Sequence, residues 1–187
     1  MPRPARYTAD VLLDAAAELL AAEGPGAVTM SAVARSTGAP SGSVYHRFPT
    51  RAALCGELWV RTEERFQEGL LEALSGDDDP QQRCVAGALR IVQWCRDHPV
   101  EAQVLLAGPN DLGMSEWPET VAGRRKRLQR KLRKVLAELP DEGGRVTAAI
   151  MDVPAAVVRR HLRARQAIPP SADEIVATCA RALISPN

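Results

Sequence analysis

The chain has 187 residues, of which 45% are hydrophobic and 25% charged, the balance of a folded domain rather than of a disordered chain. Lys and Arg total 24 against 23 Asp and Glu, a net charge of +1 that excludes a uniformly basic coating protein but allows a local basic surface. No apolar run approaches the roughly 18 residues that span a bilayer, and acidic residues interrupt the first apolar stretch where a signal peptide needs an unbroken one. Four scattered cysteines without a C-x-x-C pair favour a reducing compartment. We therefore expect a cytoplasmic protein with no membrane segment.

Apolar residues recur at helical spacing along most of the chain, whereas no segment alternates apolar and polar residues as a half-buried strand does. This pattern predicts an all-α fold of about nine helices. The first four are expected at residues 8–23, 30–37, 41–47 and 51–75. Gly24 stands where a left-handed cap would end the first helix, Thr29 is typical of an N-cap, and Gly38 ends the second helix.

The second half of the chain is divided by prolines that stand between helical segments. Asp79 and Pro80 are typical of an N-cap and a first helical residue, and the apolar residues on all sides from Cys84 to Cys95 predict a central buried helix. A long helix is then expected to bury Val121, Leu128, Leu132, Val135 and Leu139. Two further helices are expected at residues 142–165 and 171–184. The first of these is expected to bury Val146, Ile150, Val153 and Val157, with a kink at Pro154.

Two short helices joined by a tight turn, with a longer helix before them, form a helix-turn-helix arrangement. In the turn, Gly38 supplies the backbone freedom that a sharp angle needs. The third helix carries small or hydrogen-bonding residues, namely Ser41, Gly42, Ser43, Tyr45, His46 and Arg47. Val44 and Phe48 can face the core. A helix this short and polar contributes little to a core, but its hydroxyls and cations suit a DNA groove, where they can reach base edges and phosphates.

The stretch VTMSAVARSTGAPSGSVYHRFPTRAALCGELW resembles the N-terminal DNA-binding segment of the TetR family of transcriptional regulators. The residues that carry the resemblance are Thr29, Ala34, Gly38, Tyr45, Phe48, Arg51 and Leu54. The resemblance covers about residues 6–60. It implies a helix-turn-helix domain over residues 6–60 that binds double-stranded DNA, and a helical effector-binding and dimerisation domain over residues 61–187.

The same resemblance implies roles for single residues. Phosphate contacts are implied for Thr29, Tyr45 and Arg51. Base-edge or groove contacts are implied for Ser31, Ser41, Gly42, Ser43 and His46. Pro40 departs from the Ser that many members carry as an N-cap; it is compatible with a first helical position, so the cap must come from elsewhere. Arg3 and Arg6 precede the first helix and suit an arm that enters the minor groove or contacts phosphate, or else belong to an unordered terminus.

Beyond residue 60 the resemblance concerns architecture alone. It implies a homodimer in which the helices at 142–165 and 171–184 pair with their copies as a four-helix bundle. Such a dimer would set two recognition helices about 34–36 Å apart, on a palindromic operator. The effector is an unknown small molecule, and its candidate contacts are Trp94, His98, Trp117 and Met151, with Cys95 nearby. For each of these residues we favour the alternative interpretation, in which it is plain core rather than a ligand contact.

A basic run begins at Arg124 and continues to Lys134. It indicates either a second nucleic-acid or membrane surface, or a solvated helix face opposite the apolar stripe. In the second interpretation, which we favour, the cations pair with acidic residues such as Glu63, Glu64, Glu68 and Glu72.

Other functions find little support in the residues. Cys95 and His98 form the sole neighbouring Cys–His pair, and the chain has no Gly-rich phosphate loop and no nucleophile elbow. We therefore expect no enzyme, metal or cofactor. The remaining alternatives are a helical adaptor that binds protein, and a transcriptional activator of the same fold. We favour a repressor in which effector binding tilts the helix at 51–75 and so changes the separation of the two recognition helices.

Overall fold

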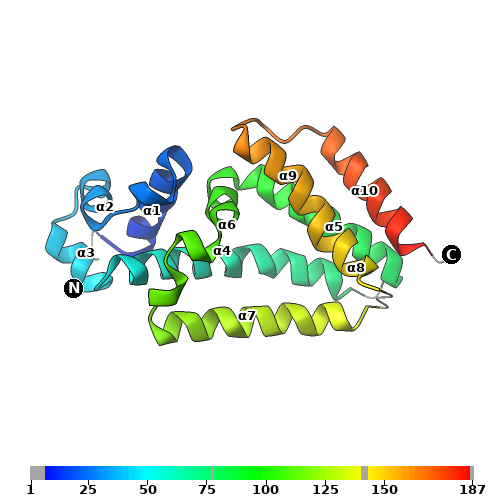
Figure 1. The fold of residues 1–187 in the computed structure, drawn as a ribbon, viewed down its shortest axis with the longest axis horizontal. Helices are drawn as coiled ribbons and strands as arrows, with labels where there is room; N and C mark the ends of the chain where they lie inside the picture. Colours follow the sequence, from blue (N-terminus) through cyan, green and yellow to red (C-terminus); the bar gives the residue numbers. More distant parts are fainter. Residues whose placement is uncertain (1–6, 77, 140–142, 186–187) are drawn as a thin grey trace, which may run out of the picture. The chain divides into compact units, whose positions relative to one another are not determined.

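The computed structural model describes residues 7–76, 78–139 and 143–185 (Figure 1). The described residues form helices and connecting turns without a strand, which confirms the predicted all-α fold. In chain order the α-helices are α1 (Ala9–Glu23), α2 (Met30–Thr37), α3 (Ser41–Arg47), α4 (Arg51–Leu74), α5 (Pro80–Asp97), α6 (Pro99–Asp111), α7 (Glu119–Ala137), α8 (Arg145–Thr147), α9 (Val153–Arg163) and α10 (Ser171–Ile184). None of the described helices is both long and apolar enough to cross a membrane. Arg3 and Arg6, considered above as a DNA-binding arm, lie outside the described residues.

The chain divides into two compact units. The N-terminal unit holds the residues up to Thr62 together with 103–125, and the C-terminal unit holds 63–102 together with the residues from 126 onward. Three helices, α4, α6 and α7, contribute residues to both units.

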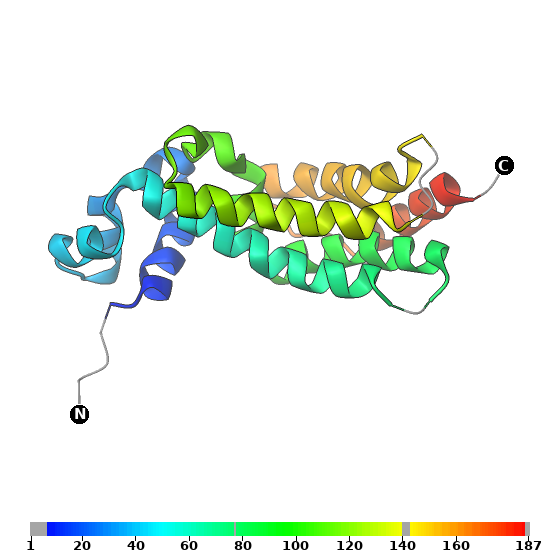
Figure 2. The same cartoon turned by 90° about the horizontal axis from the view of Figure 1, so that it is seen from below.

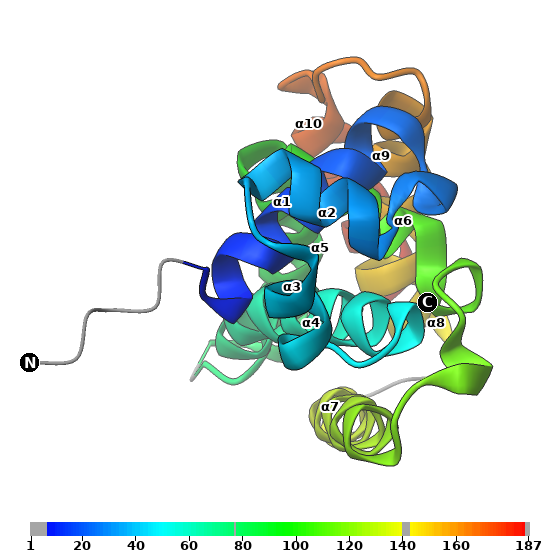
Figure 3. The same cartoon turned by 90° about the vertical axis from the view of Figure 1, so that its left-hand side faces the viewer.

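In the N-terminal unit, α1, α2 and α3 form one group, seen together in Figure 3. Their fully buried side chains include Leu12, Val33 and Val44. Two threonines begin helices as N-caps: the Oγ1 of Thr8 accepts a hydrogen bond from the amide of Val11 at 3.3 Å, which starts α1, and Thr29 does the same for α2. These local signals place the first three helices where the sequence predicts them.

Two details at the helix ends differ from the prediction. Gly24 has φ +90° and ψ 175°, a positive-φ conformation that favours glycine but is not the left-handed helical one expected, and the chain then enters a short 3₁₀ turn at Pro25–Ala27. Pro40 is the N-cap of α3 rather than its first helical residue, since its ψ of 137° is extended. Its side chain makes no capping bond, and Gly38, with φ +68°, takes the left-handed conformation that ends α2.

In the C-terminal unit, α5 packs against α9 and α10, and Figure 2 shows α9 in orange and α10 in red side by side. The buried residues of α5 are Cys84, Gly87, Ala88, Ile91, Val92, Trp94 and Cys95, which confirms the predicted central buried helix. Asp79 is its N-cap, because its Oδ2 accepts a hydrogen bond from the amide of Gln81 at 3.0 Å, and Pro80 is its first residue. At its other end, Arg96 donates to the carbonyl of Ile168 at 3.2 Å and pairs with Asp173, which ties the start of α10 to α5.

The predicted helix at 142–165 consists of α8, a π-helical segment at Ala148–Asp152, and α9; residue 142 itself lies outside the described residues. The buried residues are Val146, Ala149, Ile150, Pro154, Val158 and Leu162, and all of them except Ala149 are spaced by four. Val153 and Val157, predicted to be buried, are only half-buried. A turn of π-helix contains more residues than a turn of α-helix. Each buried position after the π-segment therefore comes one residue later in the chain than α-helical spacing predicts. Pro154 directly follows the π-segment, whose residues are themselves helical, and it has no N–H to donate to a carbonyl of that segment.

Candidate nucleic-acid interface

Helix α3 is held on its inner side by two apolar residues. Val44 is 0% exposed and Phe48 is 4% exposed, as the sequence predicts. The turn before α3 is closed by the amide of Ala39, which donates to the carbonyl of Ala34 at 3.0 Å. The hydroxyl of Tyr7, two residues before α1, donates to the carbonyl of Gly38 at 2.9 Å and so also contacts this turn. The short helix therefore has a defined position although most of its residues are polar.

The outer side of α3 carries the predicted DNA-contact residues. Ser41, Gly42, Tyr45, His46 and Arg47 are exposed, and Ser43 is half-buried. Tyr45 is 54% exposed, an unusual degree for an aromatic residue anchored in a helix this short. Among the described residues, none of these side chains makes a hydrogen bond or an ion pair, so their donors and acceptors remain available for an external partner.

Thr29 and Ser31 lie together at the exposed N-terminus of α2. The Oγ1 of Thr29 accepts a hydrogen bond from the amide of Ala32 at 3.1 Å, and it lies 3.2 Å from the Oγ of Ser31. The N-terminus of a helix carries partial positive charge and favours a phosphate group. These two hydroxyls are thus close enough to contact the same anion.

We expect the Thr29→Ala substitution to lower the free energy of unfolding by about 1 kcal/mol, because it removes the cap of α2. Thr29→Ser keeps the capping oxygen and should retain most of that stability. Urea denaturation of both variants checks this. Equal stability losses in the two variants would contradict the capping role.

Arg51 is bonded to the loop that precedes α2. Its Nε donates to the carbonyl of Val28 and its Nη2 to the carbonyl of Pro25, both at 2.7 Å. Sequence reasoning missed this role, since two backbone carbonyls far along the chain leave no pattern in the sequence. The guanidinium has five N–H donors, so these two bonds leave others for a phosphate.

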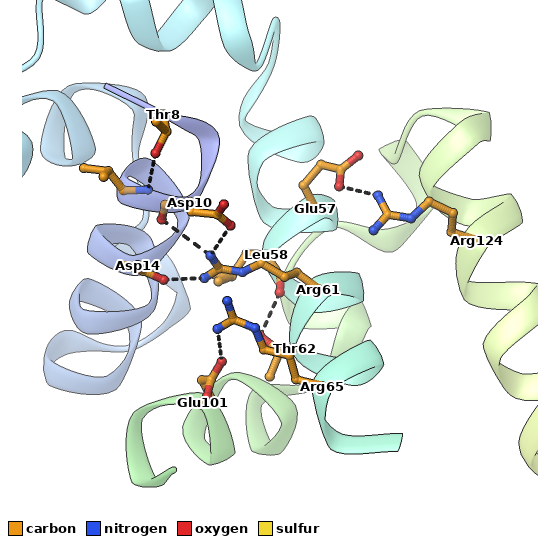
Figure 4. Close-up of polar contacts among 11 residues, drawn as sticks. Thr8, Asp10, Asp14, Glu57, Leu58, Arg61, Thr62, Arg65, Glu101 and Arg124 are labelled. Carbon is orange, nitrogen blue, oxygen red and sulfur yellow. Dashed lines mark hydrogen bonds and ion pairs between the residues drawn. The ribbon is translucent and has the colours of Figure 1, made fainter. Parts of the chain in front are cut away.

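Three ion pairs, made by two arginines, hold α4 within the N-terminal unit (Figure 4). Arg61 pairs with Asp10 at 3.0 Å and with Asp14 at 2.8 Å, which joins α4 to α1. Arg124 pairs with Glu57 at 2.6 Å, which joins the first half of α7 to α4. The side chain of Arg61 is only 11% exposed, so its two bonds are screened less than those of a fully solvated pair.

Aromatic residues add to the contact between α4 and α7. The ring centroids of Trp59 and Trp117 lie 5.9 Å apart, and the guanidinium of Arg125 lies 5.1 Å from the centre of the Trp59 ring. Gly56 permits this close approach, because a Cβ there would lie 3.0 Å from both Trp117 and Val121. Arg124 and Arg125 of the predicted basic run are therefore engaged in structural contacts.

The four candidate effector contacts are distributed over both units. Trp117 belongs to the N-terminal unit, where it is buried and its Nε1 donates to the carbonyl of Leu112 at 2.9 Å. Met151 is half-buried in the π-segment. Trp94 and His98 lie together, with ring centroids 5.2 Å apart, and both line a surface cavity of about 490 Å³.

The cavity beside Trp94 is strongly polar. Arg65 pairs with Glu101 at 2.7 Å, and the Nδ1 of His98 lies 3.4 Å from the other oxygen of the same carboxylate. Phe66 contacts the edge of Trp94, with ring centroids 5.2 Å apart. Trp94 is 3% exposed, so it supports the wall of the cavity and presents little of its own surface.

Two of the buried cysteines, Cys55 and Cys95, have raised pKa values. Burial raises the pKa of Cys95 to about 12, and burial also raises the pKa of Cys55 against the opposing effect of Arg51. Since the thiolate is the reactive form, these residues are poor nucleophiles at neutral pH. Within the described residues, no group of three His, Cys, Asp or Glu side chains is placed to hold a metal ion.

We expect Cys55, Cys84 and Cys95 to resist iodoacetamide in the native protein at pH 8 and to react fully in urea, as peptide mass spectrometry can measure. The folded state holds the proton of Cys95 more tightly than the unfolded state, in which the pKa is near 9.0. The stabilising effect is therefore present below pH 9.0 and is lost as pH rises toward 12. Rapid native labelling of Cys95 would contradict its burial.

Comparison with known proteins places this region in a family. Residues 12–58 match the model described as bacterial regulatory proteins, tetR family. No curated protein sequence matches the chain.

Several solved structures share the fold over nearly the whole chain. The transcriptional regulator FadR from Bacillus subtilis, in complex with stearoyl-CoA, has 16% identity and a TM-score of 0.70, with 95% of this chain and 98% of that chain covered. A TetR-like transcriptional regulator from Rhodococcus sp. RHA1 has 18% identity and a TM-score of 0.69, with 100% of both chains covered. A TetR-family transcriptional regulator from Streptomyces coelicolor has 23% identity and a TM-score of 0.60, with 94% and 96% covered. Residues 12–58 therefore belong to the TetR family of bacterial regulatory proteins, and the chain as a whole has the fold of TetR-family transcriptional regulators.

Proposed function

We propose that the protein is a ligand-responsive DNA-binding transcriptional regulator, and that it represses from a palindromic operator which it releases on binding a small molecule. The observation that carries this proposal is the outer side of α3, where hydrogen-bonding side chains are exposed on a helix anchored by Val44 and Phe48. Because its proposed partner is DNA, we expect the protein to act in the cytoplasm. Residues 6–60 would form the DNA-binding domain and residues 61–187 the effector-binding and dimerisation domain.

The proposed contacts divide by chemistry. Residues proposed to contact phosphate are Thr29, Tyr45, Arg47 and Arg51. Residues proposed to contact base edges or the groove are Ser31, Ser41, Gly42, Ser43 and His46. The phosphate contacts would fix the position of α3 on any DNA, whereas the base contacts would select the sequence.

We further propose a homodimer through α9 and α10. The two helices pack together in the C-terminal unit, yet Val153 and Val157 remain half-buried and Ile175 is 44% exposed. Apolar side chains at these positions would gain burial in a four-helix bundle with a second copy. Two copies of α3 would then read the two halves of a palindrome.

The effector is proposed to act through α4. A ligand in the C-terminal unit would change the population of two orientations of α4, which continues into the N-terminal unit and is bonded there to α1 by Arg61. Of the candidate contacts, Trp94 and His98 share one cavity. The fold accommodates a small ligand in at least one similar protein, the FadR of Bacillus subtilis, which was solved with stearoyl-CoA.

The deciding experiment measures binding of the purified protein to DNA upstream of its own gene, at two salt concentrations, against a scrambled duplex. Sequence-selective binding that weakens steeply with salt is expected of a regulator, because phosphate contacts release counterions. A protein-binding adaptor would show no preference between the duplexes and little response to salt. Reporter expression with the gene deleted then separates a repressor, which raises expression on loss, from an activator.

A further inference from the structure

A groove of about 690 Å³ lies along the second half of α7, within the C-terminal unit. Its volume is within the range of about 300–1,000 Å³ that small-molecule sites occupy. Gln129, Leu132, Arg133 and Leu136 line it from α7, spaced by three or four residues so that they share one side of the helix. Leu139 continues the apolar part of the lining beyond the helix.

The apolar side of this half of α7 is incompletely covered. From residue 126 to residue 137, no side chain is buried. The large apolar residues Leu128, Leu132, Val135 and Leu136 are all half-buried, although they form the regular stripe that a helix normally packs into a core. The groove therefore offers partly exposed hydrocarbon surface that a ligand could remove from water.

One edge of the groove is cationic. Lys126, Arg130 and Arg133 follow one line along α7, at spacings of four and three residues, and Arg133 lines the groove itself. All three side chains are exposed, and none of them forms an ion pair with another described residue. Like charges at this spacing repel one another, so a bound anion would relieve the repulsion.

We infer that this groove binds an amphiphilic anion, with a single aliphatic chain against Leu132, Leu136 and Leu139 and a carboxylate or phosphate head at Arg133. The inference rests on the proposed regulatory function, for which this ligand would be the effector. Glu63 also lines the groove, and its Oε1 accepts a hydrogen bond from Gln67 at 3.0 Å. Repulsion by this carboxylate directs the anionic head toward the α7 edge.

The test is a direct titration of the purified full-length protein, without DNA, by calorimetry. The ligands are palmitate, hexadecyl phosphate, octanoate and hexadecylamine, each kept below its micelle concentration. We expect the two long-chain anions to bind, octanoate to bind more weakly because it covers less apolar surface, and hexadecylamine to fail. The tighter of the two long-chain anions identifies the head group as a carboxylate or as a phosphate.

Two charge reversals on α7 provide a matched pair. Arg133→Glu removes the cation that lines the groove and should weaken palmitate binding by about tenfold or more. Arg127→Glu makes the same change at an exposed residue that does not line the groove, and should alter binding by less than about twofold. Leu136→Ala, which shortens the apolar lining, should weaken palmitate more than octanoate.

Several results would overturn the inference. Equal binding of hexadecylamine, or equal losses in Arg127→Glu and Arg133→Glu, would show that no charged site exists in the groove. If the protein bound phosphatidylglycerol vesicles, and Arg127→Glu and Arg133→Glu weakened that binding equally, the basic side of α7 would be a membrane-binding surface instead. The DNA-binding assay tests the two proposals separately. Palmitate binding without DNA binding would contradict the regulatory function but support the ligand site in the groove. DNA binding without palmitate binding would support the regulatory function but contradict the ligand site.

Discussion

Replacement of Tyr45 by Ala is expected to weaken binding to every DNA sequence by about tenfold or more, because the contact proposed for Tyr45 is with phosphate, which carries no sequence information. Tyr45 is 54% exposed and makes no bond with another described residue, so its removal should change the free energy of unfolding by less than about 0.5 kcal/mol. Fluorescence anisotropy with the operator and with a scrambled duplex measures the first effect, and urea denaturation measures the second.

Ser43→Ala is the matched control on the same helix. It should change the ratio of affinities for operator and scrambled DNA, whereas Tyr45→Ala and the milder Tyr45→Phe should leave that ratio nearly constant. If Tyr45→Phe and Ser43→Ala both left operator affinity unchanged, α3 would not be the recognition helix.

Replacement of Phe48 by Ala is expected to lower the free energy of unfolding by about 3–5 kcal/mol, since it leaves a cavity where a buried aromatic ring stood. Phe48 is 4% exposed, and its amide donates to the carbonyl of Val44 at 2.8 Å to close the last turn of α3. DNA binding should be lost together with stability, because α3 would no longer hold its position. Thermal unfolding followed by circular dichroism gives the size of the effect.

Phe48→Leu separates anchoring from direct contact with DNA. Leucine restores most of the buried volume, so both stability and operator affinity should largely return. A variant that regained stability but not affinity would show that the ring itself contacts DNA, which its burial contradicts.

Features that depend on residues close together in the sequence could be predicted, whereas features that depend on residues far apart in the sequence could not. The ends of α2 were predictable because Thr29 and Gly38 act on backbone groups a few residues away. The outer residues of α3 could be chosen because Val44 and Phe48 alone have the apolar spacing of an inner side. Such signals are contained in a short window of sequence.

Long-range contacts could not be predicted in this way. Arg51 bonds to carbonyls of the loop before α2, and Arg124 pairs with Glu57, a residue that was not among the acidic partners suggested for the basic run. Both depend on where helices lie in space. The groove along α7 was also missed, because a regular apolar stripe predicts burial and does not reveal that the partner surface is incomplete.

The π-segment at Ala148–Asp152 has a consequence for the surface that α9 exposes. If this segment became regular α-helix with no change in the number of residues, α9 would rotate by about 100° relative to the helix before it. The half-buried Val153 and Val157 would then exchange places with buried positions, although the composition of the segment would hardly change. A substitution that favours the α-helical form of this segment would therefore change which side chains α9 leaves exposed, without changing the length of the chain.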